Sequence, residues 1–223
     1  MLEKMAVFFE NRLSGYDEHM LSAIEGAAEF YEFTARQLPT RPGSEILDLG
    51  CGTGLELERY FPLNPDARIT GIDLSAAMLK ELASKFSDKE LNLINGSYFD
   101  VPFENRKYNA AVSVESLHHF TEDQKLSLYK RLFCALEPDG YFILTDYFAE
   151  SDMLEKEYSE NLQKLKEEQN ITDSEFYHYD TPLTVEHEIK ILEAAGFSDV
   201  KILKNWGATY VIRADYKPKR RLK

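Results

Sequence analysis

Three glycines and one aspartate have a type and spacing suited to holding a nucleotide-like ligand. Gly50-x-Gly52-x-Gly54 follows a predicted short buried strand at 45–49 and precedes a predicted helix at 55–61. Glycine permits dihedrals and close approaches that a Cβ would prevent, so the backbone N–H groups of such a turn can contact a ligand. Asp73 ends the next apolar run, where a carboxylate can accept both hydroxyl protons of a ribose.

The glycine spacing separates nucleotide classes. A dinucleotide fingerprint, G-x-G-x-x-G, would need glycine or alanine at Leu55 or Leu57, and neither is present. The turn also lacks the Lys and Ser/Thr pair that closes a triphosphate-binding loop. The glycine spacing therefore disfavours an NAD-binding dehydrogenase.

The elements around this turn alternate between strand and helix patterns. Such alternation predicts βαβ units with right-handed crossovers, and therefore a largely parallel sheet covered by helices on both faces. Capping residues Ser75, Thr121 and Thr184 open three of the helices. The strands are expected at 45–49, 68–72, 91–95, 108–114, 141–146, 200–203 and 208–214.

The remaining segments are predicted to cover this core. Apolar spacings of three and four predict one helix from 17 to 38, and a charged helix is expected at 150–170. The aromatic segment 171–181 is predicted to be a loop. One domain follows, divided as an N-terminal helical cap (1–40), a ligand-binding core (41–147), a helical insertion or lid (148–182), a C-terminal helix with strands (183–216) and a basic tail (217–223).

The composition restricts the partners. The net charge of −13 disfavours nucleic acid, because sequence-independent affinity for phosphates rests on Lys and Arg. The basic end is interpreted as a solvated terminus. No window has the apolar length of a membrane span, and the N-terminus lacks the order of a secretory signal, so cytoplasmic residence is expected. Two cysteines, Cys51 and Cys134, are read as free thiols.

Several motifs in order resemble one family. Glu45-Ile-Leu-Asp-Leu-Gly-Cys-Gly-Thr-Gly54 is similar to the first motif of class I S-adenosylmethionine-dependent methyltransferases, and Ile69-Thr-Gly-Ile-Asp-Leu-Ser75 to the second. The similarity spans about residues 40 to 215. Its further matches are Asn95-Gly-Ser-Tyr-Phe-Asp-Val-Pro-Phe103, Tyr108 to Phe120, Leu136-Glu-Pro-Asp-Gly-Tyr141 and Ala194-Ala-Gly-Phe197.

This resemblance implies a fold, a cofactor and contacts. The expected fold is α/β: a doubly wound, Rossmann-like, seven-stranded, mostly parallel sheet with the last strand antiparallel and helical lid elements. The implied cofactor is S-adenosylmethionine, with S-adenosylhomocysteine as product. The expected cofactor-binding residues are Asp48, Gly50, Cys51 and Gly52 near the methionine part, Asp73 on the ribose, Leu74, Met78, Ser97 and Tyr98 near the adenine, Glu115 near the methyl group, and Tyr16 in a covering N-terminal segment with Phe9 and Arg12.

Methyl transfer from a sulfonium needs alignment and sometimes a base. Glu115, His118 and His119 are the catalytic candidates, and Tyr147 and His178 are further candidates for a base. No metal ligand is assigned, because adjacent histidines are expected to aim their rings in different directions.

The acceptor stays open. A methyltransferase with a small-molecule acceptor is favoured, and a homodimer is left open. The alternatives are an enzyme similar to carboxy-S-adenosylmethionine synthases, for which Arg12 or Arg213 would have to lie near the methyl carbon, and a non-catalytic S-adenosylmethionine-binding protein.

Overall fold

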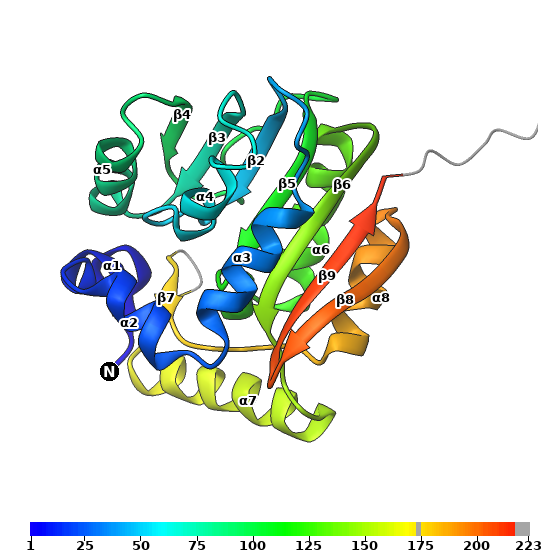
Figure 1. Cartoon of the computed structure of the whole chain (residues 1–223). Helices are drawn as coiled ribbons and strands as arrows, with labels where there is room; N and C mark the ends of the chain where they lie inside the picture. Colours follow the sequence, from blue (N-terminus) through cyan, green and yellow to red (C-terminus); the bar gives the residue numbers. More distant parts are fainter. Residues whose placement is uncertain (173–174, 217–223) are drawn as a thin grey trace, which may run out of the picture.

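A computed structural model describes residues 1–172 and 175–216, and its centre is a seven-stranded sheet (Figure 1). The order is β4-β3-β2-β5-β6-β9-β8, in which β9 runs antiparallel to both neighbours and the other pairs are parallel. The predicted fold class is therefore confirmed. The basic tail, 217–223, lies outside the described residues. The strands are β2 (Glu45–Leu49), β3 (Arg68–Asp73), β4 (Glu90–Asn95), β5 (Tyr108–Val114), β6 (Leu136–Tyr147), β8 (Ser198–Trp206) and β9 (Thr209–Asp215).

Helices cover both faces of the sheet. Alternate residues of β2 enter different cores: Ile46 belongs to one buried cluster, whereas Leu47 and Leu49 belong to the other. β2 is buried on both faces, and Asp48 is the buried polar residue within it. The first cluster contains residues of α2 (Tyr16–Ala23), α3 (Ala27–Gln37), α4 (Leu55–Tyr60) and α5 (Ala76–Lys85); the second contains α6 (Glu122–Ala135) and α8 (Val185–Ala195).

The prediction of a single helix at 17–38 is wrong. The segment divides into α2 and α3 around Gly26, whose φ is +73°. A Cβ at Gly26 would lie 2.7 Å from the side chain of Trp206. The chain turns here because the indole fills the space beside a left-handed glycine, which apolar periodicity does not reveal.

A second, two-stranded sheet joins the N-terminus to the segment after α7 (Asp152–Glu168). In it β1 (Glu3–Lys4) pairs antiparallel with β7 (Tyr177–His178), so the loop predicted at 171–181 is wrong at these two residues. The Met5 N–H, which opens α1 (Met5–Arg12), donates to the Phe176 carbonyl at 2.9 Å. Figure 1 shows α1, α2 and β7 grouped together at one end of the molecule.

Across the described part of the chain, no helix combines the length and apolar character that crossing a bilayer would take.

Candidate functional site

A cavity of about 510 Å³, including its open mouth, lies where β2, β3 and β5 end. The N-terminal segment supplies one wall and the strand ends supply the others. Its lining residues are Met5, Phe9, Tyr16, Gly50, Gly52, Asp73, Leu74, Met78, Tyr98, Val114, Glu115, Ser116 and His119.

The glycine turn presents bare backbone to this cavity. Gly50 has φ +75°, and a Cβ there would lie 2.1 Å from Oγ of Ser116. Gly52 has φ +47°, and a Cβ there would meet no atom within 4 Å. The first glycine therefore permits close packing against the segment after β5, and the second leaves open space in front of the turn.

Asp73 connects the turn to the next strand. Its Oδ2 accepts from the Gly52 N–H at 2.9 Å and its Oδ1 accepts from the Ser75 N–H at 2.8 Å. Burial raises the pKa of Asp73, and these two N–H groups oppose that shift. Each carboxylate oxygen keeps a second lone pair, so Asp73 could still accept hydroxyl protons from a ligand.

Two buried carboxyl groups lie at the base of the turn. Oδ2 of Asp48 and Oε1 of Glu56 have no hydrogen-bond partner among the described residues. Burial, with the charge of Glu56, raises the pKa of Asp48 well above its usual range, and burial raises the pKa of Glu56 to about 7. Unsatisfied buried oxygens of this kind favour a cationic group nearby.

Of the residues expected to contact a cofactor, most line the cavity. Asp48, Cys51 and Ser97 do not: Asp48 lies with Glu56, the Cys51 sulfur packs at Gly71, and Ser97 Oγ accepts from the Phe99 N–H at 3.1 Å. Those that the structure brings together are Tyr16, Gly50, Gly52, Asp73, Leu74, Met78, Tyr98 and Glu115.

Glu115 is held in a strained backbone conformation directly after β5. Its φ of +48° is uncommon for a residue other than glycine, and such strain concentrates at functional sites. Oε1 accepts from Oγ1 of Thr209 at 3.2 Å. Burial, and then the charge of Asp146, raises the pKa of Glu115 to about 8.

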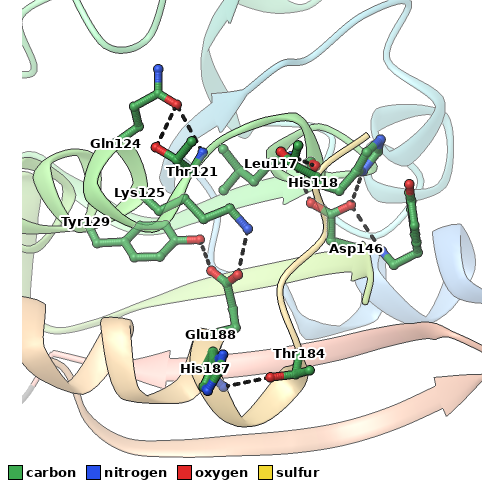
Figure 2. Close-up of polar contacts among 12 residues, drawn as sticks. Leu117, His118, Thr121, Gln124, Lys125, Tyr129, Asp146, Thr184, His187 and Glu188 are labelled. Atoms are coloured by element: carbon green, nitrogen blue, oxygen red, sulfur yellow. Dashed lines mark hydrogen bonds and ion pairs between the residues drawn. The ribbon is translucent and has the colours of Figure 1, made fainter. Parts of the chain in front are cut away.

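His118 and His119 lie on a short 3₁₀ turn, Leu117–His119. Nδ1 of His118 is 2.5 Å from Oδ1 of Asp146, and Oδ2 of Asp146 accepts from the Leu117 N–H at 2.8 Å; Figure 2 shows both contacts. Burial alone would lower the pKa of His118, but Asp146 outweighs it, and the net shift is upward. His119 lines the cavity, and burial, with the charge of His118, lowers its pKa to about 4.

The expectation that these two rings diverge is wrong. Their centroids are 4.0 Å apart, and both rings face one carboxylate oxygen, Oδ1 of Asp180, which lies 3.0 Å from Nδ1 of His119 and 3.7 Å from Nε2 of His118. The tight 3₁₀ turn brings the side chains together. Sequence reasoning missed Asp146, whose position at a strand end was a usable signal, and Asp180, for which no local pattern gave one.

The other candidates for a base surround this pair. The Tyr147 ring lies 4.5 Å from that of His118, measured between centroids. His178 stacks on Phe8 with centroids 3.4 Å apart and lies 4.9 Å from His119. Neither Tyr147 nor His178 is among the residues that line the cavity.

Sequence comparisons find similarity to methyltransferases. A family model described as a methyltransferase domain matches residues 46–140. The chain is 29% identical over 212 residues to the biotin biosynthesis bifunctional protein BioHC of Teredinibacter turnerae, covering 85% of this chain and 35% of that protein. It is 32% identical over 111 residues to a tRNA (carboxymethyluridine(34)-5-O)-methyltransferase of Arabidopsis thaliana, covering 49% of this chain and 26% of that protein.

A solved structure has the same fold. Human N-acetylserotonin methyltransferase in complex with SAM superposes with a TM-score of 0.61 at 20% identity, covering 85% of this chain and 51% of that chain. A methyltransferase domain is thus recognised at residues 46–140, and the fold is that of class I S-adenosylmethionine-dependent methyltransferases. It spans about a third or less of the length of the two curated relatives described above.

Proposed function

We propose that this protein binds S-adenosylmethionine and catalyses in-line methyl transfer to a small-molecule acceptor. The observation that carries the proposal is one cavity that joins the glycine turn and Asp73 to Glu115 and His119. A nucleotide-binding edge and a set of polar side chains thus line one partly covered cavity.

The lining of the cavity suits the chemistry of the cofactor. The open space at Gly52 leaves room for a ligand against the turn, and Asp73 can accept ribose hydroxyls. Leu74, Met78 and Tyr98 offer an apolar surface for a base. The cavity has no Lys or Arg among its described lining residues, while carboxyl groups lie beside and below the turn, which suits a ligand with ammonium and sulfonium charges.

Catalysis rests mainly on alignment. When bound, S-adenosylmethionine supplies an activated methyl group on a sulfonium and leaves as S-adenosylhomocysteine. Glu115 and His119 line the wall against which an acceptor would lie, and Tyr16 and Phe9 cover the cavity from the N-terminal segment. Enclosure of this kind orients the two reactants and excludes water.

The acceptor is proposed to be a small molecule because the cavity is partly covered and the chain is acidic. Because one relative is a tRNA methyltransferase, a nucleic-acid acceptor is the competing proposal. Nothing basic among the described cavity residues would hold phosphates.

The carboxy-S-adenosylmethionine alternative lacks its expected cation. Arg12 stacks on Phe8 and pairs with Glu3, and Arg213 pairs with Asp215 over Tyr141. Neither arginine lines the cavity. A fixed cation near the methyl carbon would be needed to hold the additional carboxylate.

The test is calorimetric titration with S-adenosylmethionine, S-adenosylhomocysteine and NAD. We expect the first two to bind, NAD not to bind, and Asp73→Ala to weaken the binding by about tenfold or more. Asp88→Ala is the matched control, because Asp88 is exposed and, within residues 1–172 and 175–216, its ion pair is with the neighbouring Lys89. Binding of NAD alone would overturn the proposal; binding without turnover of any metabolite in a mixture would favour a non-catalytic binding protein.

A further inference from the structure

We infer that a divalent first-row transition metal ion binds beside the cavity, held by Nε2 of His118, Nδ1 of His119 and Oδ1 of Asp180. The ligand atoms of these three residues lie within 4.8 Å of one another. Two of them are imidazoles and one is a carboxylate, a donor set that suits zinc, iron, cobalt or nickel.

The spacing of the three atoms suits one ion. Zinc lies about 2.0–2.2 Å from imidazole nitrogen and carboxylate oxygen, so two ligands of the same ion are roughly 3–4 Å apart. The Asp180 oxygen is 3.0 Å from the His119 nitrogen and 3.7 Å from the His118 nitrogen. An ion could therefore sit between them with little movement of the side chains.

The Asp180 oxygen is the independent sign of a missing partner. Oδ1 is buried, yet it makes no hydrogen bond of normal geometry within the described part of the chain. The His118 nitrogen, at 3.7 Å, is beyond hydrogen-bond distance, and the His119 nitrogen, at 3.0 Å, does not count as its hydrogen-bond partner. A buried carboxylate oxygen left in this state is costly, and a bound cation would satisfy it.

His118 is already oriented as a metal-binding histidine would be. Its Nδ1 faces Asp146 at 2.5 Å, which leaves Nε2 as the free nitrogen directed toward Asp180. A carboxylate behind a ligating imidazole is the usual arrangement in metal sites, where it fixes the ring and its tautomer. Asp146 is itself fixed by the Leu117 and Tyr147 N–H groups, at 2.8 Å and 3.1 Å.

His119 requires one adjustment. Its Nδ1 also lies 3.3 Å from the Tyr179 carbonyl, a long contact that binding of the metal would replace. The proton would then reside on Nε2. Because His119 lines the cavity, the ion would stand at the cavity wall.

The other two clusters of metal-binding side chains have partners that explain them. Glu155 accepts from the Thr184 N–H at 2.6 Å and contacts His187 at 2.9 Å, and the third member, Asp152, is exposed. In the cluster of Glu115, His118 and Asp146, Thr209 donates to Glu115. Asp146 already accepts from the Leu117 and Tyr147 N–H groups and contacts His118.

Three protein ligands leave coordination positions open. This last part rests on the proposed function: an oxygen of the acceptor, such as a hydroxyl, could occupy an open position and be held near the methyl donor. The inferred acceptor class is therefore an oxygen nucleophile.

The test is titration of the full chain, without a histidine tag and freed of metal by a chelator, with Zn²⁺ and with Co²⁺. We expect one equivalent to bind, with a visible absorption band for bound Co²⁺. Asp180→Asn and His119→Asn should each weaken binding at least about tenfold. His187→Ala, in the cluster with Asp152 and Glu155, should leave affinity unchanged.

Circular dichroism and S-adenosylmethionine titration of each variant separate the outcomes. Loss of metal affinity in a folded variant that keeps its cofactor affinity supports the site. Equal metal affinity in wild type, Asp180→Asn and His119→Asn, or loss of affinity in His187→Ala, overturns the inference. Absence of cofactor binding in wild type would instead contradict the proposed function and leave the metal result readable.

Discussion

The cavity has two sides that are built differently. The turn side, Gly50 to Gly52 with Asp73, comes from two adjacent strands and is held by backbone: the Gly50 N–H donates to the Ile72 carbonyl at 2.8 Å. The histidine side, Glu115, His118 and His119 with Asp180, is assembled from segments far apart in the chain. It depends on contacts such as that of the Thr181 N–H with the His118 carbonyl at 2.7 Å.

This difference predicts that the two sides fail separately. Apart from Gly50, which packs against Ser116, substitutions in the turn should remove cofactor binding with little effect on the histidine side. Substitutions around His118 should disturb that side and leave the turn intact, because no turn-side hydrogen bond described above involves Asp146 or Asp180. Local backbone geometry thus determines one half of the site, and long-range side-chain contacts determine the other.

The largest effect is expected for Gly50→Ala. The new Cβ would overlap Ser116, and alanine would be forced into a left-handed backbone conformation. We expect a loss of S-adenosylmethionine affinity of about 100-fold and a loss of roughly 2–4 kcal/mol in the free energy of unfolding. Calorimetry and urea denaturation measure these two quantities.

Gly15→Ala is the control for this substitution. Gly15 has φ +84°, but a Cβ there would meet nothing within 4 Å. Its cost should be limited to the backbone strain, about 1–2 kcal/mol, with unchanged affinity. Equal loss of affinity in both variants would show that strain, rather than contact with Ser116, governs the turn.

Asp146→Asn tests the other side. Asp146 accepts from the Leu117 N–H and pairs with His118, and an amide cannot replace both interactions. We expect a loss of about 2–3 kcal/mol in the free energy of unfolding, with cofactor affinity changed less than about threefold. Asp139→Asn, at an exposed position near the start of β6, is the control. A fall in affinity as large as that of Gly50→Ala would contradict the separation of the two sides.

The same contrast explains what the sequence could predict. The strand segments along the chain and the turn side were predictable, because apolar periodicity and a glycine motif are local signals. The break at Gly26 depends on Trp206, and the pairing of β1 with β7 joins residues more than 170 positions apart. The convergence of His118 and His119 on Asp180 likewise depends on contacts that no short window contains.

A smaller effect, which depends on pH, is expected for the stability contributed by Glu56 on the turn side. Burial raises the pKa of Glu56 in the folded chain to about 7, above its ordinary value of 4.5. The folded state therefore holds the proton more tightly, and stability falls as pH rises from about 4.5 through 7. Glu56→Gln should be more stable than wild type by about 1–2 kcal/mol at pH 8 and nearly equal to it at pH 5.

Thermal or urea unfolding at several pH values measures this difference. Glu58→Gln is the matched control on the same helix, because Glu58 is partly exposed and pairs with Lys85 at 3.0 Å. A constant difference between Glu56→Gln and wild type at all pH values would show that the buried carboxyl pair does not ionise as described.

The smallest effect is expected where the N-terminal segment meets the histidine side. Met5→Pro removes the N–H that donates to the Phe176 carbonyl, at a helix start where proline is tolerated. Met5→Ala is the matched variant, since it also removes the buried side chain but keeps the N–H. We expect Met5→Pro to be about 1 kcal/mol less stable than Met5→Ala, with faster hydrogen exchange at 175–180. Unchanged exchange there, or faster exchange in the glycine turn, would show that the N-terminal segment does not hold the histidine side in place.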